Sequence, residues 1–467
     1  MLIVAQIAST AATARLVVPR EFGLYATALA ASGFAGYFTM VAIGGGLQRR
    51  SRLGEKTVGT AMTLSLASSL LISIAVLVGA SLWARAWGVP DAASVVRIVA
   101  ITLFLTSAAT VPIALIRRRL EFGKAAVIET SSVVLGLAVG VALAIELHSA
   151  VALALGQAVG AATLFVAATA IVRDELRLSF ERADARELFT FAGQVGVLDF
   201  SAFIAITMPS WFTARAFGPF VLGLYSRAST IVALPLTYAA TSIYKVLYPL
   251  YGRVRDDLTR TKVLVDEGLT LTTGLGWPLF ALVAGASPVI VEVLLGPGWE
   301  GAKPLVALFA LMACGDLPSE LLKNAAQALG WMRLIAVRQA AFFVGVAATL
   351  ATVHLADLGL NWLLAGLAAS QWATYLLTLS PFVRRGLLNA RSVMRGQGIH
   401  AGAAVAIYGV AAACAHAADG AAIAVQILSL VAVAVAVCAA LIVFRSWLPA
   451  GRVLGRRLAQ VAPRGRG

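Results

Sequence analysis

The sequence predicts an all-α polytopic membrane protein of about fourteen transmembrane helices, built as two homologous six-helix lobes plus a C-terminal helix pair. Three observations lead to this prediction. Of the 467 residues, 60% are hydrophobic and only 13% are charged, with a mean hydropathy of +0.89; a soluble chain of this length needs far more polar surface. The Lys and Arg residues are concentrated in alternate loops. One motif occurs twice at a constant offset.

Apolar runs of roughly 20 residues are long enough to cross a bilayer as helices. The first run begins at Met1 and could imitate a signal peptide, but it lacks the positively charged start, and its match to a later run favours a retained helix. Two runs, 57–84 and 420–444, contain no charged residue at all. The predicted spans are 1–18, 24–48, 57–84, 93–116, 125–146, 149–172, 188–214, 222–246, 267–296, 303–323, 337–356, 359–383, 400–418 and 420–444.

The distribution of basic residues predicts the orientation. One set of alternate loops holds 30 of the 37 Lys and Arg residues, the opposite set holds 6, and Arg227 lies inside a span. Cytoplasmic loops carry the excess of Lys and Arg, so both termini are expected to be cytoplasmic. Most of the net charge of +15 then reflects membrane topology, and no nucleic-acid partner is expected.

The repeated motif reads ARLVVPREFGLYATALA from Ala14 and ARAFGPFVLGLYSRAST from Ala214. The shared residues include an Arg, a Pro and a Gly-Leu-Tyr triplet, each exactly 200 positions apart. In both copies an apolar run ends at the Arg, a short turn contains the Pro, and a second apolar run opens on the triplet. Two copies of one helix-turn-helix unit indicate two homologous lobes, as in many secondary transporters.

The loops complete the predicted domain organisation. Polar linkers with cytoplasmic character separate the two lobes from each other and from the last two spans. The predicted parts are an N-lobe at 1–172, a linker at 173–187, a C-lobe at 188–384, a linker at 385–399, the last helix pair at 400–445 and a basic tail at 446–467.

The cysteines and histidines suggest no metal site. The three cysteines (Cys314, Cys414 and Cys438) are widely separated within apolar runs, and the four histidines are equally scattered. Neither pattern has the spacing of metal ligands or of a disulfide framework. No G-x-x-x-x-G-K-[ST] motif is present. No cofactor is therefore expected, and nucleotide-driven transport is not indicated.

Five motifs occur in order along the chain. They are Phe22-Gly23-Leu24-Tyr25, Ile116 to Phe122 (IRRRLEF), Gly223 to Ala228 (GLYSRA), the run from Leu234-Pro235 to Tyr248-Pro249, and Leu295 to Trp299 (LGPGW). Their order and spacing together resemble the polysaccharide transporter family, the oligosaccharide flippases of the MATE-like multidrug, oligosaccharidyl-lipid and polysaccharide exporter superfamily. The resemblance covers essentially the whole chain. This chain departs from the family's pattern in lacking a basic segment before the first span.

The resemblance implies two lobes around a central cavity, alternating access, and a bacterial cytoplasmic-membrane location. It also implies a polyprenyl-diphosphate-linked oligosaccharide substrate moved between leaflets. The partners to expect are the lipid bilayer, this substrate and, as further candidates, a polysaccharide polymerase and glycosyltransferases. The prediction is a transporter without enzymatic activity.

Ionisable residues inside spans are costly, so they usually face a cavity or a partner. Arg227 lies about one turn inside its span, where it either snorkels to the external surface or meets the diphosphate or acidic sugar as a cavity cation. Arg15 and Arg215 end their spans, where capping of helix C-termini is the simpler interpretation. Asp199 either pairs with Arg227 or Arg215 or couples an ion. The substrate-binding candidates are therefore Arg227, Arg215, Arg15 and Asp199, together with Arg49 and Arg50 at the internal end of the second span.

Two other functions use the same residues less well. A polytopic glycosyltransferase, polymerase or ligase acting on the same lipid-linked glycan needs acids or histidines gathered on a sizeable external loop. The acids predicted to be external are single and scattered. A MATE-like drug or cation antiporter would be expected to carry more acid and less Arg within its spans. A further group, Asp316, Glu320 and Lys323, falls on one helix face, where a structural ion pair is the favoured interpretation.

Overall fold

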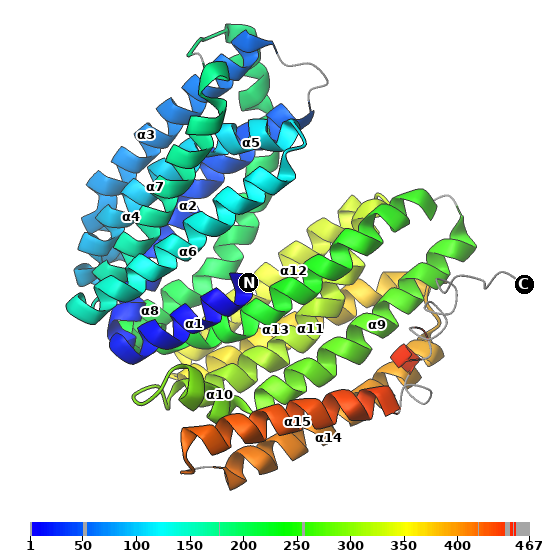
Figure 1. The fold of residues 1–467 in the computed structure, drawn as a ribbon. Coiled ribbons are helices and arrows are strands. Elements are labelled where there is room, and N and C mark those ends of the chain that lie inside the picture. The colour runs from blue at the N-terminus through cyan, green and yellow to red at the C-terminus, as the bar shows by residue number, and fades with distance from the viewer. Residues whose placement is uncertain are drawn as a thin grey trace, which may run out of the picture. The chain divides into compact units, whose positions relative to one another are not determined.

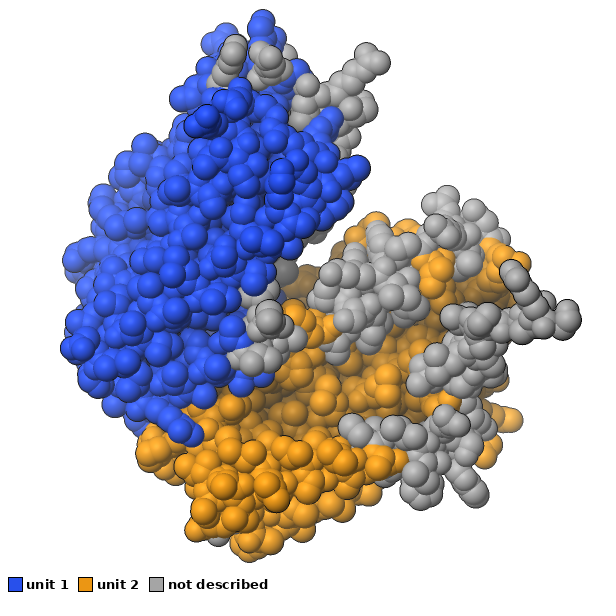
Figure 2. All heavy atoms as spheres, viewed as in Figure 1, with its two compact units in different colours: residues 1–226 blue, residues 227–467 orange. Residues whose placement is uncertain are grey.

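The computed structural model describes residues 2–49, 54–176, 178–254, 257–418, 420–443, 449–451 and 453. All secondary-structure elements within these residues are helices. The chain divides into two compact units, unit 1 from Met1 to Ser226 and unit 2 from Arg227 to Gly467 (Figure 2). The two lobes were predicted from the sequence repeat and are not the same division as these two units. The boundaries of the lobes stay a prediction.

Unit 1 is a helix bundle in which α4 is surrounded by α2, α3 and α7, while α6 packs on α7 and α1 packs on α6. The helices are α1 (Leu2–Leu16), α2 (Pro19–Arg49), α3 (Glu55–Ala86), α4 (Ala93–Ala108), α5 (Thr110–Arg118), α6 (Phe122–Leu147) and α7 (Ala150–Val172), with one-turn helices η1 (Pro90–Ala92) and η2 (Arg173–Glu175). The first part of α8 (Arg182–Val254) also belongs to this unit.

Unit 2 contains the rest of α8 and a second bundle in which α11 packs against α9 and α13. Its helices are α9 (Leu258–Gly285), α10 (Ser287–Leu294), α11 (Ala302–Ala328), α12 (Met332–Leu355), α13 (Leu360–Arg384), α14 (Ala390–Ala417) and α15 (Ile423–Val443). Helices α14 and α15 form the C-terminal pair, which lies along α9 and α10 (Figure 1). A buried cluster of Ala286, Ala411 and Val433 joins this pair to the junction between α9 and α10.

The helices follow the predicted spans closely, with differences at several breaks and helix starts. The predicted span 93–116 is divided at Ala109 into α4 and α5, and α8 begins at Arg182, inside the segment predicted as the first linker. Within the described residues, nine helices are long and apolar enough to cross a membrane, so the number fourteen stays a prediction. The predicted span 267–296 is broken at Ala286, where α10 begins at Ser287 with Pro288 in its first turn, whereas Pro278 lies inside α9 without ending it. Helix α14 begins at Ala390, inside the segment predicted as a linker. Asn389 caps its first turn by accepting from the backbone N–H of Arg391 at 3.0 Å.

The backbone repeats the pattern that the sequence motif suggested. Leu120 after α5 and Gly330 after α11 both adopt positive φ, 59° and 75°, and they lie 210 residues apart. His148 between α6 and α7 and Asp357 between α12 and α13 do the same, with φ of 47° and 49°, 209 residues apart. Such φ values are uncommon outside glycine. Their recurrence in equivalent turns supports two homologous six-helix lobes.

The contact between α6 and α7 depends on facing glycines. A Cβ atom added to Gly156 would lie 2.5 Å from the Cα of Gly140, and one added to Gly160 would lie 2.8 Å from the Ser132 carbonyl oxygen. Gly136 meets the Gly156 carbonyl in the same way, at 2.9 Å. Small residues four apart let membrane helices approach until their backbones touch. These glycines therefore set the spacing of α6 and α7.

Large apolar side chains remain exposed along the outer helices. Val78 on α3 is 76% exposed, and Val344 on α12, Val405 on α14 and Leu428 on α15 are also mostly exposed. Exposed apolar patches of this extent are uncommon on soluble monomers. In a bilayer, lipid acyl chains would surround these side chains. Their exposure therefore agrees with a multi-pass membrane protein.

The loop residues of unit 1 gather in two groups that match the two predicted loop sets. In the basic set, Arg117 pairs with Glu129 at 2.6 Å, Arg119 pairs with Glu175, and the Ser179 hydroxyl donates to the Lys56 carbonyl at 3.0 Å. In the opposite set, Arg20 pairs with Asp91, and the Ala150 N–H donates to Glu21 at 2.9 Å. Each of these contacts stays within one set, and Glu129 lies one turn inside its span beside the basic set.

Candidate functional site

The two copies of the repeated motif form two similar turns in unit 1. In the first copy, α1 ends at Leu16 and Pro19 begins α2. In the second copy, Gly218 interrupts α8 with φ of 84° and ψ of 175°, and Pro219 follows it. Proline fits the first turn of a helix because its fixed φ is helical and its missing N–H would have no helical partner there. The predicted turn between spans seven and eight is therefore present, within what is otherwise one continuous helix.

These turns meet each other through their glycines. A Cβ atom on Gly23 would lie 1.9 Å from the carbonyl oxygen of Pro219, and a Cβ atom on Gly223 would lie 1.8 Å from the carbonyl oxygen of Pro19. The contact is reciprocal: residue 23 meets residue 219, and residue 223 meets residue 19. Such a pairing is the signature of a local two-fold relation between like surfaces. The repeat thus builds one shared contact from residues 200 positions apart.

Hydrogen bonds hold the helices on either side of these turns. The Tyr25 hydroxyl donates to the side-chain oxygen of Gln157 on α7 at 3.1 Å. The Thr27 hydroxyl donates to the Gly23 carbonyl at 2.9 Å, and the Trp83 indole donates to the Thr27 carbonyl at 3.1 Å. These bonds connect α2 to α3 and to α7. The start of α2 is therefore fixed in position beside the glycine contact.

Arg15 and Arg215 lie beside the two turns, Arg215 within α8 and three residues before the break at Gly218. Arg15 is in the last turn of α1 and is exposed. Arg215 is also exposed, and its guanidinium donates to the Arg85 carbonyl at 3.4 Å, one residue before the end of α3. A cation at a helix C-terminus is favourable because carbonyl groups there lack helical donors. Arg215 thus caps the end of another helix, and a role for either residue in substrate binding stays a prediction.

Arg227 follows Ser226 in the second part of α8 and opens unit 2. It is half-buried, with its Nε atom shielded from solvent, and its repeat counterpart Thr27 is fully buried. A guanidinium keeps its charge under these conditions because its pKa is so high. The side chain therefore carries a partly desolvated positive charge within the second copy of the motif.

The other predicted site residues cannot be placed by contacts. Asp199 lies within α8, and Arg49 is the last residue of α2, but their side chains are outside the described part of the structure. Arg50 lies wholly outside the described residues. Pairing of Asp199 with Arg227 or Arg215 stays a prediction.

A polar cluster inside unit 2 contains the predicted Glu320–Lys323 ion pair and two residues that the sequence did not indicate. Arg338 of α12 donates to Glu320 at 2.9 Å and to the Ser319 hydroxyl at 3.2 Å. Gln371 of α13 donates to Asp316 at 2.9 Å. Arg338 is one of the 30 basic residues that the charge pattern assigned to the cytoplasmic loops, but the structure buries it in α12 with 7% exposure. Its position about two turns inside the apolar run that begins at Met332 could have indicated a buried arginine.

Aromatic side chains form a row in unit 1 that the sequence analysis also missed. Ring centroids lie 6.2 Å apart for Phe203 and Phe34, 5.6 Å for Phe34 and Trp83, and 5.7 Å for Trp83 and Trp87. The rings come from α8, α2 and α3. Their spacing is that of packed aromatic pairs, which stabilise a helix interface beyond their buried area. In the described part of the chain, no three His, Cys, Asp or Glu residues are grouped as metal ligands.

Solved structures with a similar fold include a flippase and a MATE family transporter. The lipid II flippase MurJ in an inward closed conformation aligns with a TM-score of 0.70 at 11% identity, covering 96% of this chain and 99% of that chain. An inward-facing multidrug resistance MATE family transporter of the MOP superfamily aligns with a TM-score of 0.65 at 14% identity, covering 85% of this chain and 96% of that chain. At these identities the similarity establishes the fold alone.

Two curated proteins are similar in sequence. The succinoglycan biosynthesis transport protein ExoT of Rhizobium meliloti is 29% identical over 301 residues, which is 64% of this chain and 60% of that protein. The lipopolysaccharide biosynthesis protein WzxC of Escherichia coli is 22% identical over 301 residues, which is 64% of this chain and 61% of that protein. The matches thus span about three-fifths of either relative. The model of the "Polysaccharide biosynthesis protein" family matches residues 12–304, more than half of the sequence, so the chain belongs to this family.

Proposed function

We propose that this protein is a flippase that moves a polyprenyl-diphosphate-linked oligosaccharide across the cytoplasmic membrane of a bacterium by alternating access. Its membership of the polysaccharide biosynthesis family over residues 12–304 carries the proposal, together with the similarity to ExoT, which is named a succinoglycan biosynthesis transport protein. The fold supports it, because MurJ, which aligns along 96% of this chain, flips a lipid. The protein acts as a transporter and not as an enzyme.

The substrate class explains why such a protein needs both an apolar surface and buried cations. A diphosphate pays a large desolvation cost inside a bilayer unless a positive charge and hydrogen-bond donors receive it. Arg227 offers a partly desolvated guanidinium, whose planar donors match phosphate oxygens in pairs. Two homologous lobes that rock about a substrate supply alternating access without a nucleotide. The six candidates named from the sequence remain proposed contacts of this substrate, with Arg227 the foremost.

The proposed orientation places both termini in the cytoplasm, on the basis of the 30 to 6 distribution of Lys and Arg. Single cysteines at positions 182 and 391, in a variant whose native cysteines are replaced by alanine, should react with a membrane-impermeant maleimide only after the cells are lysed. Cysteines at positions 91 and 357 should react in intact cells. Labelling of position 391 in intact cells would reverse this arrangement for the C-terminal helix pair.

The test of the function uses deletion of the gene in its host and complementation with the full chain. Loss of the flippase should stop surface polysaccharide and make the lipid-linked oligosaccharide accumulate in the inner leaflet, where an external glycosidase or lectin cannot reach it. Accumulation of a shorter or unligated glycan on the outer leaflet would instead identify a polymerase or ligase. Unchanged polysaccharide with raised drug sensitivity would identify a drug antiporter.

A further inference from the structure

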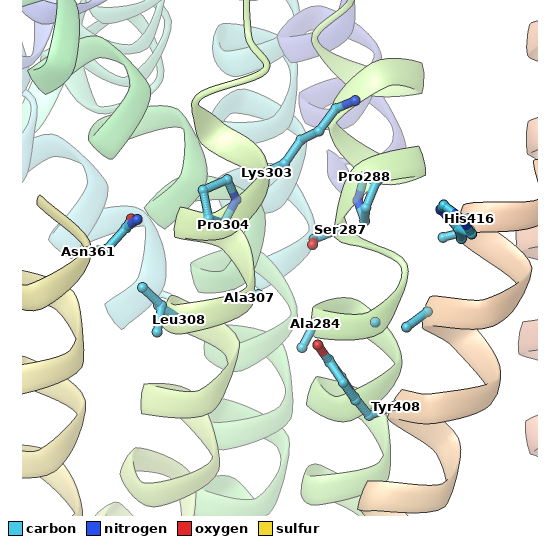
Figure 3. Close-up of a pocket in the computed structure, with 13 residues that line it drawn as sticks. Ala284, Ser287, Pro288, Lys303, Pro304, Ala307, Leu308, Asn361, Tyr408 and His416 are labelled. Atoms are coloured by element: carbon cyan, nitrogen blue, oxygen red, sulfur yellow. The ribbon is translucent and has the colours of Figure 1, made fainter. Parts of the chain in front are cut away.

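A cavity of about 530 Å³ lies in unit 2 where α9 ends and α10 begins. Its polar wall residues are Ser287 of α10, Lys303 of α11, Asn361 of α13, and Tyr408 and His416 of α14 (Figure 3). Between them the lining is small and apolar, mostly alanine and proline with Leu308. The starts of α10, α11 and α13, with Ser287, Lys303 and Asn361, form its polar end, whereas α14 contributes Tyr408 and His416 beside small apolar residues. These residues lie outside the five family motifs and are not among the proposed substrate contacts.

Three helices begin at this cavity. The first residues of α10, α11 and α13 contribute Ser287, Lys303 and Asn361 to the wall, and none of the three helices has an acidic residue in its first turn. Helix N-termini carry partial positive charge and free N–H groups. Together with the Lys303 ammonium, these helix starts supply donors that suit an anionic ligand.

The side chains leave donors available to such a ligand. Ser287 is 4% exposed, and its hydroxyl makes no hydrogen bond with another described residue; Figure 3 shows it directed into the cavity. Lys303 pairs only loosely with Glu292, at 3.8 Å, while Glu292 also accepts from Gln426 at 2.9 Å. Glu300 is the other carboxylate near Lys303. Backbone N–H groups of its own residue and of Gly298, with Lys303 adding less, lower its pKa, so it remains anionic.

The apolar part of the cavity adjoins the lipid-facing surface. Tyr408 lines the cavity and is half exposed, and Val405 and Val410 on the same helix are also exposed. Leu311, one turn beyond Leu308 on α11, is 49% exposed. A free anion would use the polar end alone, whereas a phospholipid would use both parts. A phosphate with attached acyl chains therefore matches the whole cavity.

We propose that this cavity binds the phosphate headgroup of an anionic phospholipid, with Lys303 and the Ser287 hydroxyl as donors and one acyl chain against α14. Lys303 belongs to the external loop set, so the lipid comes from the outer leaflet under the proposed orientation. The lipid bridges α14 to α10 and α11, and so secures the C-terminal helix pair on its lobe. Its binding is independent of which glycan the protein transports.

Native mass spectrometry of the purified full-length protein tests the proposal. The probes are dioleoyl phosphatidylglycerol and dioleoyl phosphatidylcholine, added at equal concentrations. The wild-type protein should retain the anionic lipid preferentially, and Lys303→Ala should weaken this retention by about three- to tenfold, as expected for loss of one partly exposed charged contact. Ala307→Phe keeps the charge and fills the cavity, so it should reduce retention of the anionic lipid as well. Arg97→Ala removes an external cation from unit 1 and is the matched control.

Three results would overturn the proposal. Equal retention of the two lipids by the wild-type protein would exclude a headgroup site. Equal loss in Lys303→Ala and Arg97→Ala would show that only the overall charge matters. Displacement of the lipid by millimolar inorganic phosphate would show that the acyl chain contributes nothing, and that the ligand is a free anion. None of these readouts depends on glycan export, so they separate this proposal from the proposed function.

Discussion

Replacing Gly23 or Gly223 with alanine is expected to destabilise unit 1 and to abolish export. The added Cβ atoms would lie 1.9 and 1.8 Å from the carbonyl oxygens of Pro219 and Pro19, so the backbone of one turn must move. Overpacking of a tight contact costs on the order of 1–3 kcal/mol, and here the obstacle is backbone rather than a flexible side chain. The measurements are membrane abundance, thermal unfolding of the purified protein in detergent, and surface polysaccharide.

Gly36→Ala is the matched control, because Gly36 lies on the same helix as Gly23 and an added Cβ would meet nothing within 4 Å. It should behave as the wild-type protein, with at most a small gain from the better helix propensity of alanine. The double variant Gly23→Ala/Gly223→Ala should lose less than the sum of the two single losses, since both residues belong to one contact. Stability of Gly23→Ala equal to that of Gly36→Ala would refute the contact.

Arg227→Ala is expected to reduce glycan export by about ten- to a hundredfold at normal abundance in the membrane. That range corresponds to the loss of a charge-assisted contact of about 1.5–3 kcal/mol. Arg227→Lys should restore only part of the export, because a point charge cannot reproduce the paired donors of a guanidinium. The measurement is complementation of a flippase-deleted strain, with protein levels determined in parallel.

The matched control for Arg227 is Arg97→Ala on α4, whose guanidinium is exposed and donates to Ser81 at 3.2 Å. It should export normally, because the loss of an exposed cation costs little. If the Arg227 side chain only snorkels to the membrane surface, both Arg227 variants should export glycan normally. Full export by Arg227→Ala at equal abundance would therefore remove this residue from the proposed site.

The membrane fold, the helix order and the repeat could all be predicted from the sequence by itself. Apolar runs, alternating basic loops and the duplicated Gly-Leu-Tyr triplet are local properties, and a bilayer imposes helices on long apolar runs because backbone polar groups must be satisfied within the segment. For this reason the predicted spans follow the helices. The Glu320–Lys323 pair was also predictable, because three residues on one helix face meet without help from the rest of the chain.

Only the tertiary structure decided which surfaces meet. The repeat showed that Gly23 and Gly223 are equivalent, but their contact with the opposite Pro219 and Pro19 depends on how helices 200 residues apart approach one another. Similarly, Glu320 pairs with Arg338 of a neighbouring helix, although the charge pattern of the sequence assigned this arginine to a loop. Contacts between residues of different helices depend on how the helices pack. That packing produces no periodic pattern or fixed spacing that can be recognised in a single sequence.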